Sequence, residues 1–165
     1  MLLLFRFLFT VLRARLRSRV GPLESSTVRF TAMPWDCDLN FHLNAGRYVS
    51  FMDIARIELL ARMRILRRVL QRGWRPVVGG GTITYRRSVQ PFERFRIESR
   101  IVAWDEKWFY LEHVVSRADG SHAATGVMRT LVRDKKGGVP TREVLEVMGL
   151  AHMESPLSSS ELPPQ

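Results

Sequence analysis

Four polar residues near position 40 have types and a spacing that could serve acyl chemistry. They alternate with apolar residues over seven positions: Asp38, Asn40, His42 and Asn44. If this segment is extended, the alternation places the four side chains on one side of the chain. A long helix is predicted to begin directly after them, and the unpaired N–H groups of a helix N-terminus can polarise a carbonyl or hold an oxyanion. A base or nucleophile, a water-orienting group and an oxyanion site are the parts that acyl hydrolysis requires.

The same residues also have a purely structural interpretation. Asn40 and Asn44 can be loop and helix-capping residues, and Asp38 can accept hydrogen bonds from backbone N–H groups of its own loop. A metal site is disfavoured, because the four histidines show no paired-ligand spacing and Cys37 is the only cysteine. The residues alone leave the catalytic and the structural interpretation open, and we expect neither a metal nor a redox cofactor.

The helix that must position these residues is predicted from Asn44 to about Gln71. Its apolar residues recur at three- and four-residue spacing: Tyr48, Phe51, Met52, Ala55, Leu59, Met63, Leu66 and Leu70. One strand is predicted before it, from Ser25 to Met33, and four after it: Val77 to Val89, Phe92 to Trp104, Trp108 to Arg117 and His122 to Arg133. A short helix from Thr141 to about Met148 follows, with Thr141 as its N-cap.

This order of elements predicts an α+β domain in which an antiparallel sheet wraps the long helix. Short turns at Gln90-Pro91, Asp105-Glu106 and Asp119-Gly120 make neighbouring strands antiparallel. Glycines at 79–81 would let a strand bend or approach the helix closely. Such a sheet has edges that must be covered, and pairing two copies edge to edge would cover them, so a homodimer is favoured.

The composition suits one folded domain with distinct ends. The chain has 165 residues, 45% of them hydrophobic, and we expect the core within residues 21–153. Residues 1–20 consist of an apolar block followed by arginines. The block is too short to cross a bilayer, and a signal peptide would carry its positive charge before the apolar block and not after it. This segment is either a helix lying in a membrane interface or a helix packed on the body or on a partner subunit. Residues 154–165 are rich in Ser and Pro, and we expect a disordered tail there.

The charge points to partners that carry phosphate groups. Lysine and arginine number 26 against 16 acidic residues, which gives a formal net charge of +10, and nearly all of the basic residues are arginine. The forked guanidinium suits phosphates. Nucleic acid is nevertheless not expected as a partner, because no recognition motif is present and the aromatic residues form no stacking platform. A single cysteine demands no oxidising compartment, so we expect a cytoplasmic protein, peripheral to a membrane if residues 1–20 bind one.

The segment from Trp35 to Tyr48 resembles the hotdog-fold acyl thioesterases, especially the 4-hydroxybenzoyl-CoA thioesterase-like and thioesterase-superfamily-member-six-like proteins. The pattern D-x-N-x-H-x-N-x-x-x-Y runs from Asp38 to Tyr48, and Met52-Asp53-Ile54-Ala55-Arg56 follows it on the helix. The segment from Trp104 to Tyr110 looks like a hairpin of the member-six-like group, and the resemblance covers roughly residues 28–133. It implies a hotdog fold: a long central helix wrapped by a five-stranded antiparallel sheet, working as a homodimer or homotetramer with active sites at the subunit interface.

The resemblance also implies roles for individual residues. Asp38 matches the family's catalytic carboxylate, as nucleophile or general base, while Asn40 and His42 match a polar pair that would orient water or substrate. The substrate-binding positions would be Asn44, Ala45, Gly46 and Tyr48, with backbone N–H groups of Ala45 and Gly46 offered to the thioester carbonyl. This sequence departs from the common pattern at Ala45, where a second Asn is usual, and at Phe41, where a Gly usually precedes the His.

A CoA substrate would need cations for its diphosphate, and the candidates are Arg86, Arg87, Arg94 and Arg96. A solvated strand edge is the competing interpretation of these arginines. We therefore expect an enzyme that hydrolyses a fatty or aromatic acyl thioester of CoA, or of acyl-carrier protein, to free acid and thiol. The alternative is a non-catalytic, membrane-peripheral hotdog protein that binds acyl-CoA or another acyl ligand.

Overall fold

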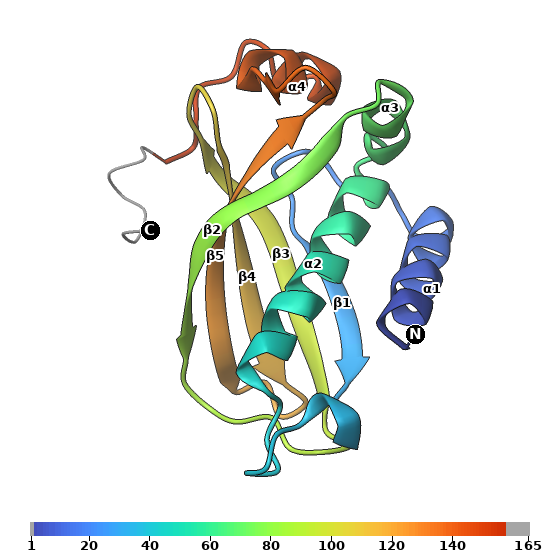
Figure 1. Cartoon of the computed structure of the whole chain (residues 1–165), viewed down its shortest axis with the longest axis vertical. Helices are drawn as coiled ribbons and strands as arrows, with labels where there is room; N and C mark the ends of the chain where they lie inside the picture. The colour runs from blue at the N-terminus through green and yellow to red at the C-terminus, as the bar shows by residue number, and fades with distance from the viewer. Residues whose placement is uncertain (1, 158–165) are drawn as a thin grey trace.

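The computed structural model describes residues 2–157, and side chains from residue 3 onward. Four α-helices and six strands follow one another along the chain (Figure 1). In order they are α1 (Leu2–Leu16), β1 (Ser26–Thr31), a 3₁₀ turn (Pro34–Asp36), α2 (Ala45–Arg62), α3 (Leu66–Gln71), β2 (Arg75–Tyr85), β3 (Arg94–Trp104), β4 (Phe109–Arg117), β5 (His122–Arg133), β6 (Gly138–Val139) and α4 (Thr141–Met148).

The strands form one antiparallel sheet that curves around α2 (Figure 1). Its order is β1-β3-β4-β5-β2, and the two-residue β6 pairs with β5 as an addition to the five expected strands. The residues of β3 alternate as expected for a sheet with one wet face, since Phe95 and Ile97 are buried while Arg94 and Arg96 are exposed. The α+β hotdog architecture expected from the sequence is confirmed.

The expected single helix from Asn44 to Gln71 is wrong, because two helices occupy this stretch. α2 ends at Arg62, and α3 begins at Leu66 after a turn in which Arg64 has a φ of 63°. Met63 and Ile65 both pack into the same buried cluster, although residues two apart point to nearly opposite sides of a helix. The break lets both face the core, and it shifts the helical spacing: α3 buries Val69 in that cluster, whereas Leu66, expected on the apolar side, is half-buried and Leu70 is 57% exposed.

Two smaller expectations also change. The strand expected to reach Val89 ends at Tyr85. Pro140, not Thr141, is the N-cap of α4, and Thr141 is its first helical residue. The proline ring fixes φ at the cap position, and no side-chain cap hydrogen bond forms there.

The glycines at 79–81 serve a bend in β2. The register with β5 shifts between Val78 and Gly80, which is a β-bulge. A Cβ at Gly79 would overlap the ring of Trp108, so this position accepts only glycine. The close approach to α2 comes from a different strand: at Gly126 in β5, a Cβ would lie 2.8 Å from Met52 Sδ. The bend therefore occurs at the glycines for which it was expected. The close approach to α2 occurs instead at Gly126, which the sequence analysis did not single out.

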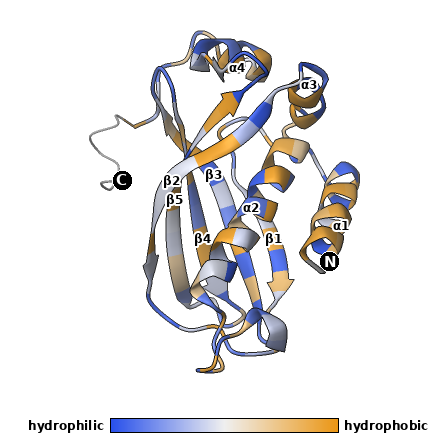
Figure 2. Ribbon diagram, in the orientation of Figure 1, coloured by the Kyte–Doolittle hydropathy of each residue, from blue (hydrophilic) through white to orange (hydrophobic). Residues whose placement is uncertain are grey.

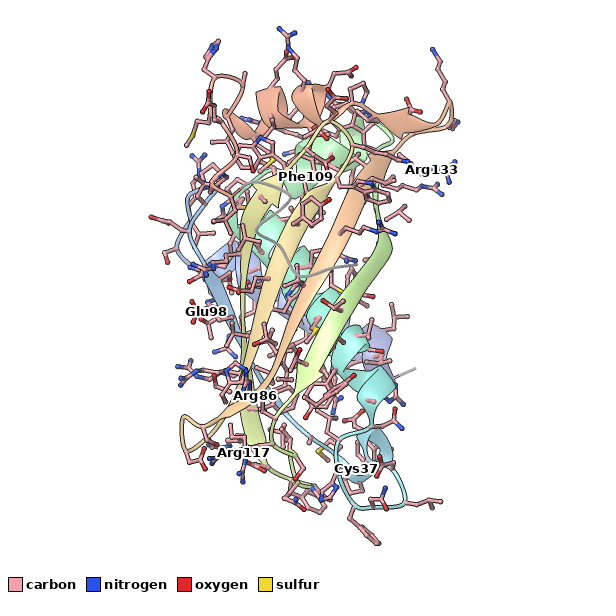
Figure 3. All side chains as sticks on the ribbon, turned by 90° about the vertical axis from the view of Figure 1, so that its left-hand side faces the viewer. Cys37, Arg86, Glu98, Phe109, Arg117 and Arg133 are labelled. Atoms are coloured by element: carbon pink, nitrogen blue, oxygen red, sulfur yellow. The ribbon has the colours of Figure 1, made fainter. Side chains whose placement is uncertain are left out.

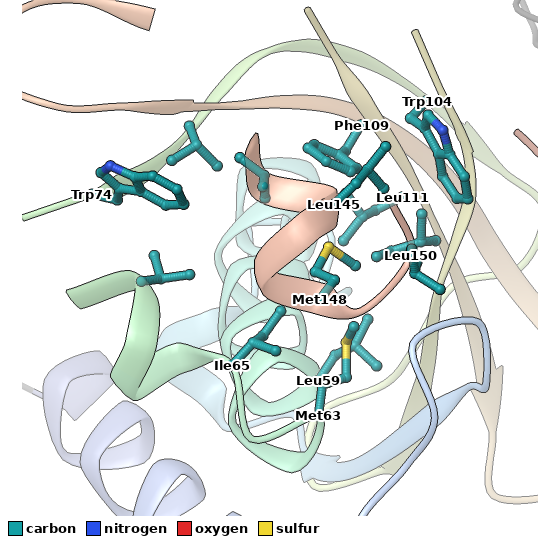
Figure 4. Packing of buried hydrophobic residues seen from close by; sticks show 14 of the residues in the cluster. Leu59, Met63, Ile65, Trp74, Trp104, Phe109, Leu111, Leu145, Met148 and Leu150 are labelled. Atoms are coloured by element: carbon teal, nitrogen blue, oxygen red, sulfur yellow. The ribbon is translucent and has the colours of Figure 1, made fainter. Parts of the chain in front are cut away.

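The core between α2 and the sheet has two parts. Near the start of α2 the rings of Phe30, Phe51 and Phe95 pack together, with centroids 4.8 to 5.6 Å apart. Near its end a larger cluster joins α2, α3, the sheet and α4, and includes Leu59, Met63, Trp74, Trp104 and Met148 (Figure 4). α4 thus closes one end of the sandwich, and the other end carries the loop before α2.

The two termini lie outside this core. α1 packs on α2 beside β1 (Figure 1), and no helix among residues 2–157 is long and apolar enough to span a membrane. Near the other terminus, Ser155 Oγ accepts a hydrogen bond from Trp104 N–H, and Leu157 bridges to Ala103. The remainder of the expected tail, residues 158–165, lies outside the described residues.

Candidate active site

The segment with the alternating polar residues is a tight turn. Asp38 N–H donates to His42 O at 2.9 Å, Phe41 N–H donates to Asp38 O at 3.0 Å, and Cys37 bridges to Leu43. Asp38 Oδ1 accepts from Asn40 N–H at 2.9 Å, and Phe41 adopts a left-handed φ of 56°. The segment is therefore not extended, and the condition under which the alternation would align the four side chains is not met, because the Asp38 carboxylate folds the loop back on itself.

The three expected catalytic side chains are neighbours along this turn, but no hydrogen bond joins any two of them within residues 2–157. Asp38 and His42 are half-buried, and Asn40 is exposed. Asp38 uses Oδ1 for the turn, and Oδ2 accepts no hydrogen bond from the described part of the chain. A half-buried carboxylate with one uncommitted oxygen can still act as a base or a nucleophile.

The start of α2 offers one uncommitted donor to the site. Asn44 is the N-cap, and its Oδ1 accepts from Gly46 N–H at 2.9 Å. The Gly46 N–H is thus occupied by the cap, whereas the Ala45 N–H has no acceptor among residues 2–157. Of the two expected carbonyl-binding groups, Ala45 is the one that is free to donate.

Tyr48, in the first turns of α2, packs this helix start against the end of β2. It is 3% exposed, and its ring meets that of Tyr85 edge-on at 5.2 Å. Tyr85 Oη donates to Ala45 O at 3.2 Å, which ties the end of β2 to the first turn of α2. Burial, and then the neighbouring Tyr85, raise the pKa of Tyr48 to about 12, so its hydroxyl stays protonated at neutral pH.

Arg86 lies at the same end of the molecule as Cys37 of the loop (Figure 3), and Arg87 follows it in the chain. Both are exposed, and their N–H groups donate to Ala123 O at 2.8 and 3.1 Å. Two residues later, Val89 O accepts from Leu43 N–H at 2.9 Å, so the segment that carries these arginines is hydrogen-bonded to the loop. The segment that carries this pair of cations is thus joined to the loop through the backbone.

Arg94 and Arg96 belong to another surface, the outer face of β3. With Arg29 and Arg117 they line a hollow of ≈ 450 Å³. Arg29 lies directly opposite Arg96 on the paired strand. The four arginines expected to bind a diphosphate therefore lie in two groups, of which Arg86 and Arg87 are connected to the loop.

A buried carboxylate that the sequence analysis missed holds the loop from behind. Asp36 is 1% exposed, and its Oδ2 accepts from Arg6 Nη1 at 2.8 Å and from Met33 N–H at 3.0 Å. Asp36 O accepts from Asn44 N–H at 3.0 Å, so the same residue binds the cap of α2. The spacing to Met33 is typical of a residue that closes a helical turn, but nothing in the sequence connects it to Arg6, thirty positions away.

The remaining reactive groups near the loop favour no other chemistry. Burial raises the pKa of the Cys37 thiol, with the charges of Asp36 and Asp38 adding to the effect, so the thiol stays protonated and is a weak nucleophile. Within residues 2–157 no three His, Cys, Asp or Glu side chains come together in a way that could hold a metal ion. The Asp38 carboxylate, the His42 imidazole and the start of α2 are the groups of this segment that could take part in acyl chemistry.

Comparison with known proteins gives this arrangement a family. The sequence pattern of the thioesterase-like superfamily matches residues 32–164. The chain is similar to Protein THEM6 of Xenopus laevis, with 36% identity over 103 residues that cover 62% of this chain and 50% of that protein. It is also similar to thioesterase poxG of Penicillium oxalicum, with 30% identity over 115 residues, 61% of this chain and 38% of that one.

A solved structure supports the fold independently. The DHNA-CoA thioesterase of Staphylococcus aureus superposes with a TM-score of 0.70 at 14% identity, over 78% of this chain and 88% of that one. The chain spans about half the length of the curated relatives that it matches. The fold, the loop before α2 and the match over residues 32–164 lead to one conclusion: this chain belongs to the thioesterase-like superfamily.

Proposed function

We propose that the protein hydrolyses acyl-CoA thioesters, with Asp38 as the general base or the nucleophile. The observation that carries the proposal is the half-buried Asp38 carboxylate, with Oδ2 uncommitted, in the loop that leads into α2. The uncommitted Ala45 N–H and the positive end of the α2 dipole lie at the start of that helix. Base and oxyanion donor are thus supplied by adjacent parts of one short segment.

In the general-base course, Asp38 accepts a proton from water as the water oxygen attacks the thioester carbon. The carbonyl electrons move to the oxygen, and the Ala45 N–H together with the helix dipole stabilises the resulting oxyanion. When the intermediate collapses, the C–S bond breaks and the thiolate leaves with the proton that Asp38 had accepted. In the nucleophilic course, Asp38 attacks the carbon itself, the thiolate leaves, and water hydrolyses the mixed anhydride.

Arg86 and Arg87 support CoA as the carrier of the acyl group. They are exposed cations on the segment that is hydrogen-bonded to the loop, and neither forms an ion pair within residues 2–157. Their guanidinium groups suit a diphosphate. The S. aureus structure is named for activity on a CoA thioester, which agrees with this choice. A fatty or aromatic acyl group, on CoA or on acyl-carrier protein, remains our proposed substrate range.

We also propose that the enzyme works as a homodimer paired through β2. β1 and β2 are the two edges of the sheet, and α1 lies beside β1, so β2 is the edge left open (Figure 1). Tyr85, near the end of β2, contacts Ala45 at the helix start. A second copy added at this edge would therefore come close to the proposed site, as the resemblance to hotdog enzymes implies.

The test is thiol release from short-chain, long-chain and aromatic acyl-CoAs, with the native chain compared with Asp38→Asn. We expect the variant to lose at least about 100-fold in turnover, as is usual when a general base is removed. Asp134→Asn is the matched control, because Asp134 Oδ1 also accepts from the N–H two residues later. It follows Arg133, at the opposite end of the molecule (Figure 3).

Unchanged turnover in Asp38→Asn would remove the central residue of the proposal. If the native chain turns over no member of the panel but binds acyl-CoA in a calorimetric titration, the protein is instead a non-catalytic acyl-ligand binder. The occupied Gly46 N–H is the observation that favours this alternative.

A further inference from the structure

The side of α1 toward the body of the protein is less apolar than is usual for a surface helix. The residues of α1 that are buried or half-buried are Leu3, Arg6, Phe7, Thr10, Val11 and Ala14, and Arg17 follows directly after the helix. Thr10 and Ala14 are buried, and Arg17 Nη1 donates to Glu58 Oε1 at 2.7 Å and to Thr27 O at 2.8 Å. α1 is thus attached by two buried residues, Thr10 and Ala14, and by the hydrogen bonds of Arg17, while its apolar Leu3, Phe7 and Val11 are only half-buried.

The opposite side of α1 presents large apolar side chains to solvent. Their exposed fractions run from 51% at Leu8 to 90% at Leu16, and the full set is Leu4, Phe5, Leu8, Phe9, Leu12 and Leu16. A helix on a globular protein normally turns such residues toward the core. Most of the α1 ribbon carries the hydrophobic colour although the helix lies outside the sheet (Figure 2). A contiguous apolar surface of this kind marks an interaction site.

Arginines border this surface and extend it toward α3. Arg13 and Arg15 on α1 and Arg19 after it are exposed, form no ion pair within residues 2–157, and have no acidic neighbour on the helix. A groove of ≈ 800 Å³ runs between α1 and α3, and its lining includes Arg15, Arg67 and Leu70. We call the outward side of α1 together with this groove the α1/α3 face.

We infer that the α1/α3 face docks on an anionic membrane surface, with the apolar side chains of α1 in the headgroup region and the arginines on lipid phosphates. The charge selects this occupant, because two copies of the face would oppose arginine to arginine, whereas anionic headgroups complement them. β2, on the other side of the sheet, is the open edge for a second copy (Figure 1). The 15 residues of α1 span only about 22 Å, so the helix would lie on the bilayer and not cross it.

The sequence leaves two interpretations open for residues 1–20, a helix in a membrane interface and a helix packed on the body, and the structure makes them compatible. α1 packs on the body through Thr10 and Ala14, and through Arg17 directly after it, and leaves its exposed apolar side free for lipid. The inference does not depend on the proposed hydrolysis, since it concerns a surface that includes neither Asp38 nor the start of α2.

The test is co-sedimentation of the full chain with vesicles of phosphatidylcholine alone and of equal parts phosphatidylcholine and phosphatidylglycerol. We expect binding to the anionic vesicles, weakened by salt. Phe5→Gln combined with Leu12→Gln should weaken it at least about 10-fold, because two large apolar side chains no longer enter the lipid. Arg15→Gln should weaken it about 5-fold on the anionic vesicles.

Phe92→Gln is the matched control, since Phe92 is 66% exposed but lies in the turn before β3, and its binding should equal that of the native chain. Circular dichroism checks that each variant is folded, and light scattering without vesicles records the oligomeric state. Absence of binding to anionic vesicles, or equal binding by native chain and Phe5/Leu12 variant, overturns the inference. So does a loss of oligomers in that variant, because the face would then bind a second copy.

Discussion

The helix α2 is held in two different ways on its two sides. Toward the sheet, Phe51, Met52, Ala55 and Leu59 are at most 1% exposed and pack against apolar strand residues. Toward α1 and β1, the buried residues are Glu58 and Arg62, and they are held by hydrogen bonds and ion pairs. The comparison shows that the apolar spacing of a helix predicts the residues on its sheet side. The spacing does not predict the hydrogen-bonded partners on its other side.

The polar side is a connected network. Glu58 accepts from Arg17 Nη1 and from Ser26 Oγ, and Arg62 Nη1 donates to the same Ser26 Oγ at 3.0 Å. Arg62 Nε also donates to Ser18 O at 3.0 Å. Burial, and then the nearby Arg17, lower the pKa of Arg62, an effect that Glu58 opposes. The negative charge of Glu58 thus offsets the cost of burying the positive charges of Arg17 and Arg62, which would be unfavourable without a counter-charge.

The largest effect is expected from breaking the apolar side. Phe51→Ala removes a ring that contacts both Phe30 and Phe95, and should lower the free energy of unfolding by about 3 to 5 kcal/mol. Urea denaturation measures it, with Val49→Ala, a change at a 37% exposed position of the same helix, as the control. A cost below about 1 kcal/mol would mean that the aromatic cluster collapses without loss, against the expectation for a close-packed core.

Breaking the polar side of α2 should lower the free energy of unfolding by somewhat less than Phe51→Ala does. Glu58→Gln keeps the shape but leaves Arg17 and Arg62 without their counter-charge, and should lower the free energy of unfolding by about 2 to 3 kcal/mol. The partly exposed Arg17 limits the cost. A double-mutant cycle with Arg17→Gln checks the coupling, and Glu146→Gln, in an exposed pair with Arg142, should change stability by less than about 0.5 kcal/mol. Equal costs at Glu58 and Glu146 would contradict the importance of the buried network.

Polar residues are also buried on the apolar side, and one of them, His113, gives that side a dependence of stability on pH. His113 is fully buried, its Nδ1 is 2.8 Å from Ser99 Oγ, and desolvation, followed by the charge of Arg56, lowers its pKa to about 3. The unfolded chain binds a proton below its ordinary pKa of 6.5, whereas the folded chain resists it down to about pH 3, so stability falls as pH falls through this window. Between pH 7 and 5 the loss should be about 2 kcal/mol.

Denaturant midpoints at pH 7, 6 and 5 measure this loss, and His113→Asn should remove most of it because the variant side chain does not titrate. The same pH slope in both proteins would assign the effect to other groups.

The smallest effect on stability is expected at the N-terminal end of α2, which belongs to neither side alone. Asn44→Ala removes the cap on Gly46 N–H and should lower the free energy of unfolding by about 1 kcal/mol. Asn44→Asp retains an acceptor there and should keep most of the stability. Thermal denaturation compares the two, and equal losses would show that the cap hydrogen bond is not what stabilises the first turn.

The sequence predicts most of the fold because the sheet side of the molecule follows from periodicity. The alternation in β3 and the turns before β4 and β5 have local causes, such as Asp105 Oδ1 accepting from Lys107 and Trp108 N–H. The break at Met63 to Ile65 escapes this reasoning, because both segments keep helical spacing while the core requires both side chains on one side. Tertiary packing decides that turn.

The site divides in the same way. The motif led to the loop and to the Asn44 cap, which depend on hydrogen bonds between residues close in the chain. The hydrogen bond that joins the Arg86 segment to the loop, from Leu43 N–H to Val89 O, connects residues far apart in the chain. Residues Asp38 to His42 form a turn because Asp38 Oδ1 accepts from Asn40 N–H, and the spacing of the polar residues alone does not distinguish this turn from an extended segment. Asp36 was missed because its importance comes from Arg6, which only the folded chain brings near.

The contact between Arg6 and Asp36 has a practical consequence for anyone who produces this protein. The Arg6 side chain is 18% exposed and reaches from the first turns of α1 to the loop of the proposed site, so the far N-terminus is part of the support of that loop. Trimming the first turns to improve solubility, an attractive step given six exposed apolar residues, would also remove the nearer of the two cations of the Asp36 carboxylate and leave only Arg47 Nε, 3.8 Å from Asp36 Oδ1. Assays on such a shortened chain would report on a loosened loop, and apolar positions such as Leu8 are the better ones to change.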